Sequence, residues 1–425
     1  MTAPARLLAH GVGSQHDLPL SPFYAYAGAF AALFVSFLAL GLLWSSSRFR
    51  GDRAGRPLPV ALQRLADAPA TRTTLRVLGA AAGLAVLLHL LLGPDDPDRN
   101  PAPGAVYVLL WVGLVPASLL LGPVWRLLNP LRALHALLPT PRAPRPVPAA
   151  LGIRPAAAGL LLFAWLELAA PDPASTATLL SFLAVLTAVG LLGAARHGPD
   201  WFAHADPFEV YSSLLARLSP LGRRADGRLV LRSPFNGLDS TPRTPGLVAT
   251  VCVLLGSTAY DGISDNPRWI TTLQTSALGP TPTATLGLLA AVALVAALYA
   301  LCAGTLRLMS RSLTHPLLSF AHSLLPIALG YLIAHYFTLL VTEGPRTVMM
   351  AAGTDNASAP APPLSPGGLA ALQVAAIVSG HVLGVVAAHD RSVRLFPPAR
   401  AVAGQLPLFA LMIAYTLGGI GLLIA

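Results

Sequence analysis

The positive charges of this chain follow a regular pattern along the sequence. All 28 of its basic residues are arginine, and 24 of them lie in alternate gaps between apolar runs. Because positive charge near the ends of membrane spans stays on the cytoplasmic side, these gaps are predicted to face the cytoplasm. The five gaps are Arg48–Arg76, Arg126–Arg154, Arg196–Arg243, Arg307–Arg311 and Arg391–Arg400.

The composition places most of the chain in lipid. Hydrophobic residues make up 54% and charged residues 11%, whereas a soluble domain carries roughly 25% charged residues. A bilayer core needs about 20 apolar helical residues per crossing. The sequence therefore predicts an all-α polytopic transmembrane helix bundle of about ten spans. The predicted spans are 24–44, 76–93, 104–122, 155–170, 175–194, 245–262, 284–306, 316–342, 367–388 and 404–425.

An even number of spans with basic gaps after the odd ones puts both termini outside the cell. Residues 1–23 are then an extracytoplasmic tail, residues 24–425 a single transmembrane domain, and residues 195–244 a cytoplasmic loop. Abundant alanine, leucine, proline and arginine without lysine is typical of a GC-rich bacterium, so we expect the inner membrane. The net charge of +10 indicates contact with anionic lipid headgroups and not with nucleic acid.

The first half of the chain contains an internal repeat with an offset of 77 residues. The copies are predicted at 76–148 and 153–225, where Asn129-Pro130 matches Asp206-Pro207. An Asn or Asp before Pro is a helix start, because the side chain caps the helix and Pro takes its first position. Apolar stripes beside arginines follow both starts. They predict two cytoplasmic amphipathic helices that lie along the inner leaflet.

The repeat has two interpretations. Repeats in membrane transporters form binding sites at their interfaces, but duplication can also build a scaffold alone. The eighth apolar run is also open: it is either one kinked helix, or an interfacial helix at His315–Leu325 followed by a span from Pro326.

Ionisable and tyrosine side chains within the apolar runs are the candidates for a substrate or ion path, because burying such groups in lipid is costly. Two of them, His335 and His381, lie at similar predicted depth if the eighth span begins at Pro326, and could meet there as a functional pair. The alternative is that each imidazole forms a hydrogen bond with a neighbouring carbonyl group. Gly380 and Gly384 form a small-residue face on the ninth span, which favours close approach of a neighbouring helix. The path candidates are His89, Glu167, Asp261, Tyr331, His335, Tyr336 and His381.

The N-terminal tail suggests a metal site. The residues before His10 are similar to the end of a secretory signal, and cleavage after Ala9 would leave His10 as the new N-terminus. An N-terminal histidine binds Cu(II) through its amino group and ring, and His16 could add a third nitrogen. The metal candidates are therefore His10, His16, His335 and His381, for copper or another divalent metal. The alternative is a flexible polar tail.

Several segments resemble a family of bacterial polytopic proteins labelled fenitrothion hydrolase. The similarity extends over nearly the whole chain and implies hydrolysis of an organophosphorus ester, but it identifies no catalytic residues. Phosphotriester hydrolysis usually uses a water activated by paired metals, and the sequence has no dense cluster of ligands. The similar segments are His10–Pro19, Asp206–Pro220, Gly256–Gly262, Ala334–Phe337 and Gly380–Arg391.

Three functions follow from these observations. A transporter or metal-handling protein is favoured by the repeat and the intramembrane histidines. A membrane-embedded hydrolase is implied by the resemblance. A scaffold or assembly protein, whose cytoplasmic helices bind an unknown protein partner, is the third. Soluble-enzyme motifs such as a phosphate loop or HExxH do not occur in the sequence.

Overall fold

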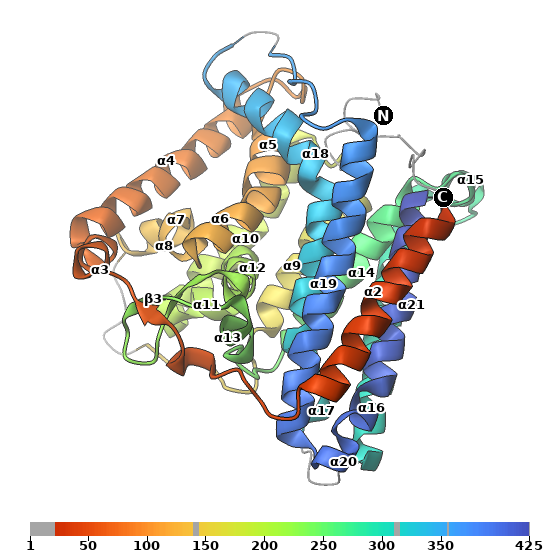
Figure 1. Cartoon of the computed structure of the whole chain (residues 1–425). Helices are drawn as coiled ribbons and strands as arrows, with labels where there is room; N and C mark the ends of the chain where they lie inside the picture. Colours follow the sequence, from red (N-terminus) through yellow and green to blue (C-terminus); the bar gives the residue numbers. More distant parts are fainter. Residues whose placement is uncertain (1–21, 139–143, 310–314, 355–356, 425) are drawn as a thin grey trace.

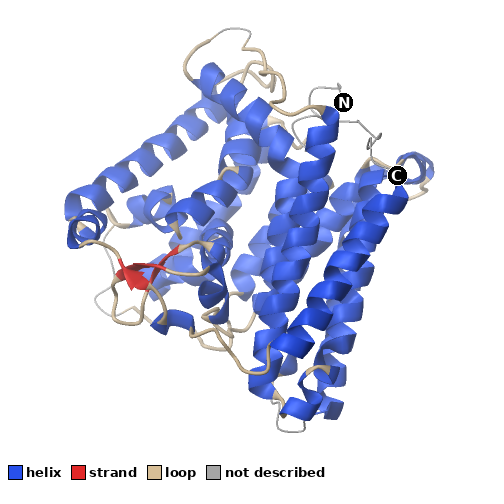
Figure 2. Ribbon diagram, viewed as in Figure 1, coloured by secondary structure: helices blue, strands red, loops and turns tan. Residues whose placement is uncertain are grey.

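The chain folds into a helix bundle, as the sequence predicts. The structure is a computed structural model that describes residues 22–138, 144–309, 315–354 and 357–424. Helices dominate it, and the strands are confined to one small sheet (Figure 2).

Nine helical segments of the described residues are long and apolar enough to cross a membrane. This confirms a polytopic membrane protein. In chain order they are α2 (Pro22–Leu43), α4 (Pro69–Leu92), the composite segment Pro101–Leu121, α10 (Thr176–His197), α14 (Leu247–Ser264), α16 (Pro280–Met309), the composite segment Pro316–Ala351, α19 (Pro366–Leu395) and α21 (Leu406–Ile424).

A tenth, shorter helix completes the bundle. Helix α9 (Arg154–Leu168) has 15 residues, which span about 22 Å at 1.5 Å per residue. The start of α2 packs against the end of α21, where Ala25 and Ala29 cluster with Ile420. Both helix ends therefore lie at the same end of the bundle (Figure 1). This requires an even number of crossings, so α9 counts as the tenth.

The third crossing is not a regular α-helix. It consists of α5 (Pro101–Gly104), a π-helical segment η2 (Ala105–Val112) and α6 (Leu114–Leu121). The Gly113 N–H donates to the Val108 carbonyl, five residues earlier, as in a π-turn. Pro116 cannot donate a backbone hydrogen bond, which disturbs the regular ladder at this point. π-turns inside helices are frequent at functional sites.

The eighth apolar run is divided close to Pro326, where the second of the two interpretations begins its span. The interfacial position of the preceding helix stays a prediction. A short helix α17 (Pro316–Phe320) and a turn η5 (Ala321–Leu324) precede the long helix α18 (Leu325–Ala351). The close approach expected at Gly380 is confirmed. A Cβ atom on Gly380 would lie 2.5 Å from the Pro326 carbonyl oxygen, so the α18 and α19 backbones meet there.

Both repeat copies contain the same short helices. Helix α7 (Trp125–Leu128) and α8 (Pro130–His135) in the first copy correspond to α11 (Phe202–Ala205) and α12 (Pro207–Leu215) in the second. Helix α8 packs against α4 of its own copy and α10 of the other. Helix α12 likewise packs against α9 of its own copy and α6 of the other.

The predicted position of the second amphipathic helix is wrong. Eight of the nine residues of α12 are buried, so this helix lies inside the bundle and not along the inner leaflet. Its polar residues have partners there: Glu209 binds Arg132 of α8, and the Ser212 hydroxyl lies 2.8 Å from that of Ser118. Helix α8 keeps exposed positions, including Leu134.

A three-stranded antiparallel sheet lies beside these helices in the order β1-β3-β2. A turn at Asp226-Gly227 joins β2 (Leu221–Arg223) to β3 (Leu229–Leu231), and β1 (Arg56–Pro57) adds a strand from a distant loop. The remaining short elements are η1 (Gly51–Arg53), α3 (Val60–Asp67), η3 (Pro199–Trp201), η4 (Ala216–Leu218), α13 (Pro234–Asp239), α15 (Pro267–Thr275), α20 (Pro398–Ala401) and η6 (Ala403–Gln405).

Candidate functional site

Four of the predicted path residues come together inside the bundle, and we call them the core cluster. Glu167 ends α9, Asp261 lies near the end of α14, and His335 and Tyr336 are neighbours on α18. All four are buried, with at most 5% of each residue exposed. Helix α14 packs directly against both α9 and α18, which explains why residues so distant in sequence meet.

The core cluster contains two carboxyl groups, one imidazole and one phenol. The His335 Nδ1 atom lies 3.8 Å from Asp261 Oδ2. Glu167 is close enough to Asp261 for the two carboxyl groups to repel each other when both are ionised, and the Tyr336 hydroxyl is in hydrogen-bonding contact with each of them. Two negative charges in an apolar interior are costly, so this arrangement favours the binding of a proton or cation.

Aromatic side chains that the sequence analysis did not select surround the core cluster. Trp111 of η2 stacks on Tyr211 of α12, with ring centroids 4.5 Å apart, and its ring centroid lies 6.5 Å from that of Tyr336. Tyr107, also of η2, donates a hydrogen bond to the Pro173 carbonyl. The one signal in the sequence was Pro116, a helix-disturbing residue inside an apolar run.

Several polar atoms in and beside the core cluster lack a hydrogen-bond partner among the described residues. They include Oε1 of Glu167 and the hydroxyl of Tyr211, and Tyr211 is close enough to Glu167 to feel its charge. Buried polar groups are nearly always hydrogen-bonded, so each exception needs an explanation such as a redox, catalytic or ligand-binding role. The core cluster is therefore the best candidate for a binding site.

Two further candidates lie next to the core cluster, and the predicted histidine pair has a different form. The Tyr331 ring lies 6.5 Å from His335 and 5.7 Å from His381. His381 shares a hydrogen bond with the Ile377 carbonyl of its own helix, whereas His335 faces Asp261. Each imidazole thus has its own partner, and Tyr331 packs between them.

The seventh candidate, His89, lies elsewhere. Its Nδ1 atom is 2.8 Å from the Ala85 carbonyl of its own helix, α4. The His89 carbonyl accepts a hydrogen bond from Asn100 at the start of α5. These contacts fit a structural role at the turn between two crossings.

The predicted metal ligands are only partly placed. His10 and His16 lie outside the described residues. Within the described residues, no group of three or more His, Cys, Asp or Glu side chains is arranged to hold a metal ion. His335 and His381 therefore do not belong to a recognisable metal centre in that part of the chain.

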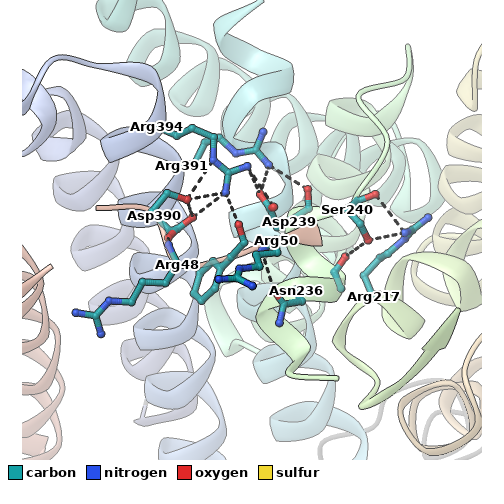
Figure 3. A network of polar contacts seen from close by, with 12 residues as sticks. Arg48, Arg50, Arg217, Asn236, Asp239, Ser240, Asp390, Arg391 and Arg394 are labelled. Carbon is teal, nitrogen blue, oxygen red and sulfur yellow. Dashed lines mark hydrogen bonds and ion pairs between the residues drawn. The ribbon is translucent and has the colours of Figure 1, made fainter. Parts of the chain in front are cut away.

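A second polar region, which we call the arginine network (Figure 3), lies where α2 ends, at the opposite end of the bundle from the start of α2 (Figure 1). It joins the loop after α2, the end of α13 and the end of α19. Asp390 accepts hydrogen bonds from the Ser47 hydroxyl and the Arg48 backbone. Asp239 accepts hydrogen bonds from Arg391 and Arg394. The network comprises Ser47, Arg48, Asp239, Asp390, Arg391 and Arg394.

The arginine network was missed because its arginines were assigned to topology alone. Asp390 and Arg391 are 1% and 5% exposed, so these charges are paired inside the protein and not simply solvated. Arg394 also donates hydrogen bonds to Ser47 and Asp390. The network therefore holds the ends of three segments together and stabilises this end of the bundle.

Comparisons with known protein families, curated proteins and solved structures find no match to this chain.

Proposed function

We propose that this protein is a membrane transporter whose binding site is the core cluster, and that a proton held by Glu167 and Asp261 is coupled to transport. The observation that carries the proposal is the meeting of two carboxyl groups and an imidazole from three helices inside a membrane bundle. Intramembrane groups of this kind form proton relays in pumps and carriers.

A proton suits this site better than a metal ion. The two neighbouring carboxyl groups repel each other when both are ionised, as in carboxyl pairs that share one proton. His335 and Tyr336 can pass a proton because both side chains donate and accept hydrogen bonds. A metal ion needs at least three suitable ligands, and the described residues offer no such group. Copper binding by His10 and His16 remains a separate prediction, tested by the metal content of purified protein.

The site supports transport more directly than hydrolysis. Hydrolysis of an organophosphorus ester, the activity implied by the family resemblance, usually uses a water molecule on paired metals. The core cluster is instead enclosed by aromatic rings and joins crossing helices, one of which contains a π-helical segment. Helices that are irregular at membrane depth commonly surround transporter binding sites.

Infrared difference spectroscopy on purified protein in lipid nanodiscs tests the proton site without knowledge of the substrate. We expect a protonated carboxyl band in the wild type that changes with pH and is lost in Glu167→Gln or Asp261→Asn. The matched control is Asp226→Asn, which removes an exposed carboxyl group and should leave the band intact. A band that is unchanged in both core variants would refute the proton site.

A second experiment tests transport. Proteoliposomes that contain a pH-sensitive dye are exposed in turn to sugars, amino acids, amines and copper salts. We expect at least one compound to move protons with the wild type and the Asp226→Asn control but not with Glu167→Gln. Proton movement that persists in Glu167→Gln would overturn the assigned site, and its absence with every class in the wild type would count against proton-coupled transport.

A further inference from the structure

Two side-chain contacts join equivalent positions of the two repeats. Asn129 donates a 2.8 Å hydrogen bond to Asp206, and Arg132 donates two hydrogen bonds of 2.6 and 2.7 Å to Glu209. Both pairs are separated by 77 residues, which is the offset of the repeat. Equivalent residues touch each other where two copies meet around a two-fold axis. The pairs therefore mark the centre of the contact between the repeats.

The contact is chemically unequal. The first copy supplies an amide and a guanidinium, whereas the second supplies two carboxyl groups. Arg132 is committed to Glu209 through both of its hydrogen bonds, so Asp206 has the neutral amide of Asn129 as its partner in the other copy. Burial, together with the charge of Glu209, raises the pKa of Asp206 to about 6, although hydrogen bonds from the Glu209 backbone and Asn129 act against the shift.

We propose that the Asn129–Asp206 contact is a pH-sensitive latch between the two repeats, and that it controls the core cluster through helix α12. This inference rests on the proposed function. Asp206 caps α12 by accepting a hydrogen bond from the Glu209 N–H, and the same helix carries Tyr211 to the Trp111 ring beside the core cluster. Loss of the Asn129–Asp206 contact therefore moves α12 and, with it, the Tyr211 ring beside the core cluster.

The other charged groups on the packed elements do not offset the charge of Asp206. Arg132 is engaged by Glu209, the His135 ring packs against the Phe202 ring, and the His204 ring is bonded to the Gly152 carbonyl. The charged and titratable side chains on the elements around the latch are Arg126 on α7, Arg132 and His135 on α8, Arg154 and Glu167 on α9, His204 on α11, Glu209 and Tyr211 on α12, and Arg217 on η4.

The direction of the switch follows from linkage. The docked repeats hold the proton on Asp206 more tightly than a separated state would, because its pKa is raised from 3.8 to about 6. Raising the pH through this range therefore favours separation. Since one pKa unit corresponds to a factor of ten, we expect the docked-to-separated ratio to fall on the order of 10- to 100-fold.

Distance measurement between spin labels tests the latch in the full-length protein. Labels at Leu137→Cys and Ala203→Cys, both at exposed positions, report the separation of the repeats after Cys252 and Cys302 are replaced by Ala. We expect the distance distribution to change as the pH is raised from 3.8 to about 6, and not to change further above that range. Asp206→Asn should abolish this change, because the amide group has nearly the same size as the carboxyl group and can still form hydrogen bonds, but does not titrate.

A second variant separates a titrating latch from a merely structural contact. Glu209→Gln removes the like charge beside Asp206 and frees Arg132, so the midpoint should move to lower pH while the change itself persists. An unchanged midpoint in Glu209→Gln, a persisting change in Asp206→Asn, or a pH-independent distance in the wild type would each overturn the latch. If the latch fails but the wild type shows a carboxyl band that Glu167→Gln removes, the proposed function stands. A wild-type protein without that band refutes the proposed function, whatever the latch does.

Discussion

The core cluster and the arginine network are both buried groups of charged side chains, but their charges are balanced differently. In the arginine network, Asp390 and Asp239 accept hydrogen bonds from arginines and a serine. In the core cluster, two carboxyl groups face one imidazole, and Glu167 Oε1 has no hydrogen-bond partner among the described residues. The comparison indicates that the arginine network contributes stability, whereas the core cluster holds two carboxyl groups whose charges are not balanced by arginines.

The largest expected effect is the removal of a carboxylate from the arginine network. Asp390→Ala deletes the acceptor for Ser47, Arg48 and Arg394. Because breaking a buried charge pair costs about 3–5 kcal/mol, we expect a loss of that size in the free energy of unfolding. Chemical unfolding of purified protein in detergent measures it. A loss below about 1 kcal/mol would show that solvent already screens the network.

The next largest effect should come from one hydroxyl of the core cluster. Tyr336 contacts both carboxyl groups, and a hydrogen bond to a charged group contributes about 1.5–3 kcal/mol. Tyr336→Phe should therefore reduce unfolding free energy by roughly that amount. Tyr211→Phe is the matched control, because the Tyr211 hydroxyl has no hydrogen-bond partner in the described chain. Equal losses in both variants would contradict the assigned contacts.

The sequence predicted the membrane fold well for a physical reason. Lipid requires long apolar helices, and these are a local feature of the sequence. The orientation that the arginine pattern predicts stays a prediction. Helix α9 has only 15 residues, which is short for a crossing, but its apolar run at 155–170 was sufficient to predict it. The meeting of the ends of α2 and α21 agrees with this tenth crossing.

The site was only partly predictable. Glu167, Asp261, His335 and Tyr336 could be selected because polar groups in apolar runs are conspicuous, but the sequence does not show which of them meet. Trp111 and Tyr211 remained hidden because aromatic residues are ordinary in apolar segments. The pairing of His335 with Asp261, and not with His381, depends on how α14 and α18 pack.

The burial of α12 shows a different limit. Its pattern of apolar residues beside polar ones is typical of an interfacial helix, and this led to the wrong position on the inner leaflet. The polar residues Glu209 and Ser212 in fact bind Arg132 and Ser118 inside the bundle. A sequence pattern cannot distinguish a polar face that meets water from one that meets polar partners of another helix.

A third prediction concerns whether neutralising a buried carboxylate raises or lowers the free energy of unfolding. Glu167→Gln removes one of two like charges from a buried site, so the free energy of unfolding should stay within about 1 kcal/mol of wild type or rise. The same neutralisation in the arginine network, Asp390→Asn, should be clearly destabilising. Thermal unfolding of both variants in the same detergent compares them. Destabilisation by Glu167→Gln equal to that by Asp390→Asn would remove the distinction between the two regions.

The smallest effect should come from an arginine–aspartate pair that lies at the surface and not in the arginine network. The Arg224 side chain binds Asp226, and this hydrogen bond lowers the pKa of Asp226 to about 2. The contribution of the pair is present above the unfolded pKa of 3.8 and is lost as the pH falls towards about 2.

At neutral pH we expect no measurable change in the free energy of unfolding for Asp226→Asn, because solvent screens exposed pairs. Carbon-13 NMR of aspartate-labelled protein should show the Asp226 titration moving to higher pH in Arg224→Gln, which tests the pairing itself. If Asp226→Asn destabilised the protein as much as Asp390→Asn, burial would not be what makes the arginine network strong. An exposed pair and a buried network would then contribute equally to stability, and the contrast drawn between them would not hold.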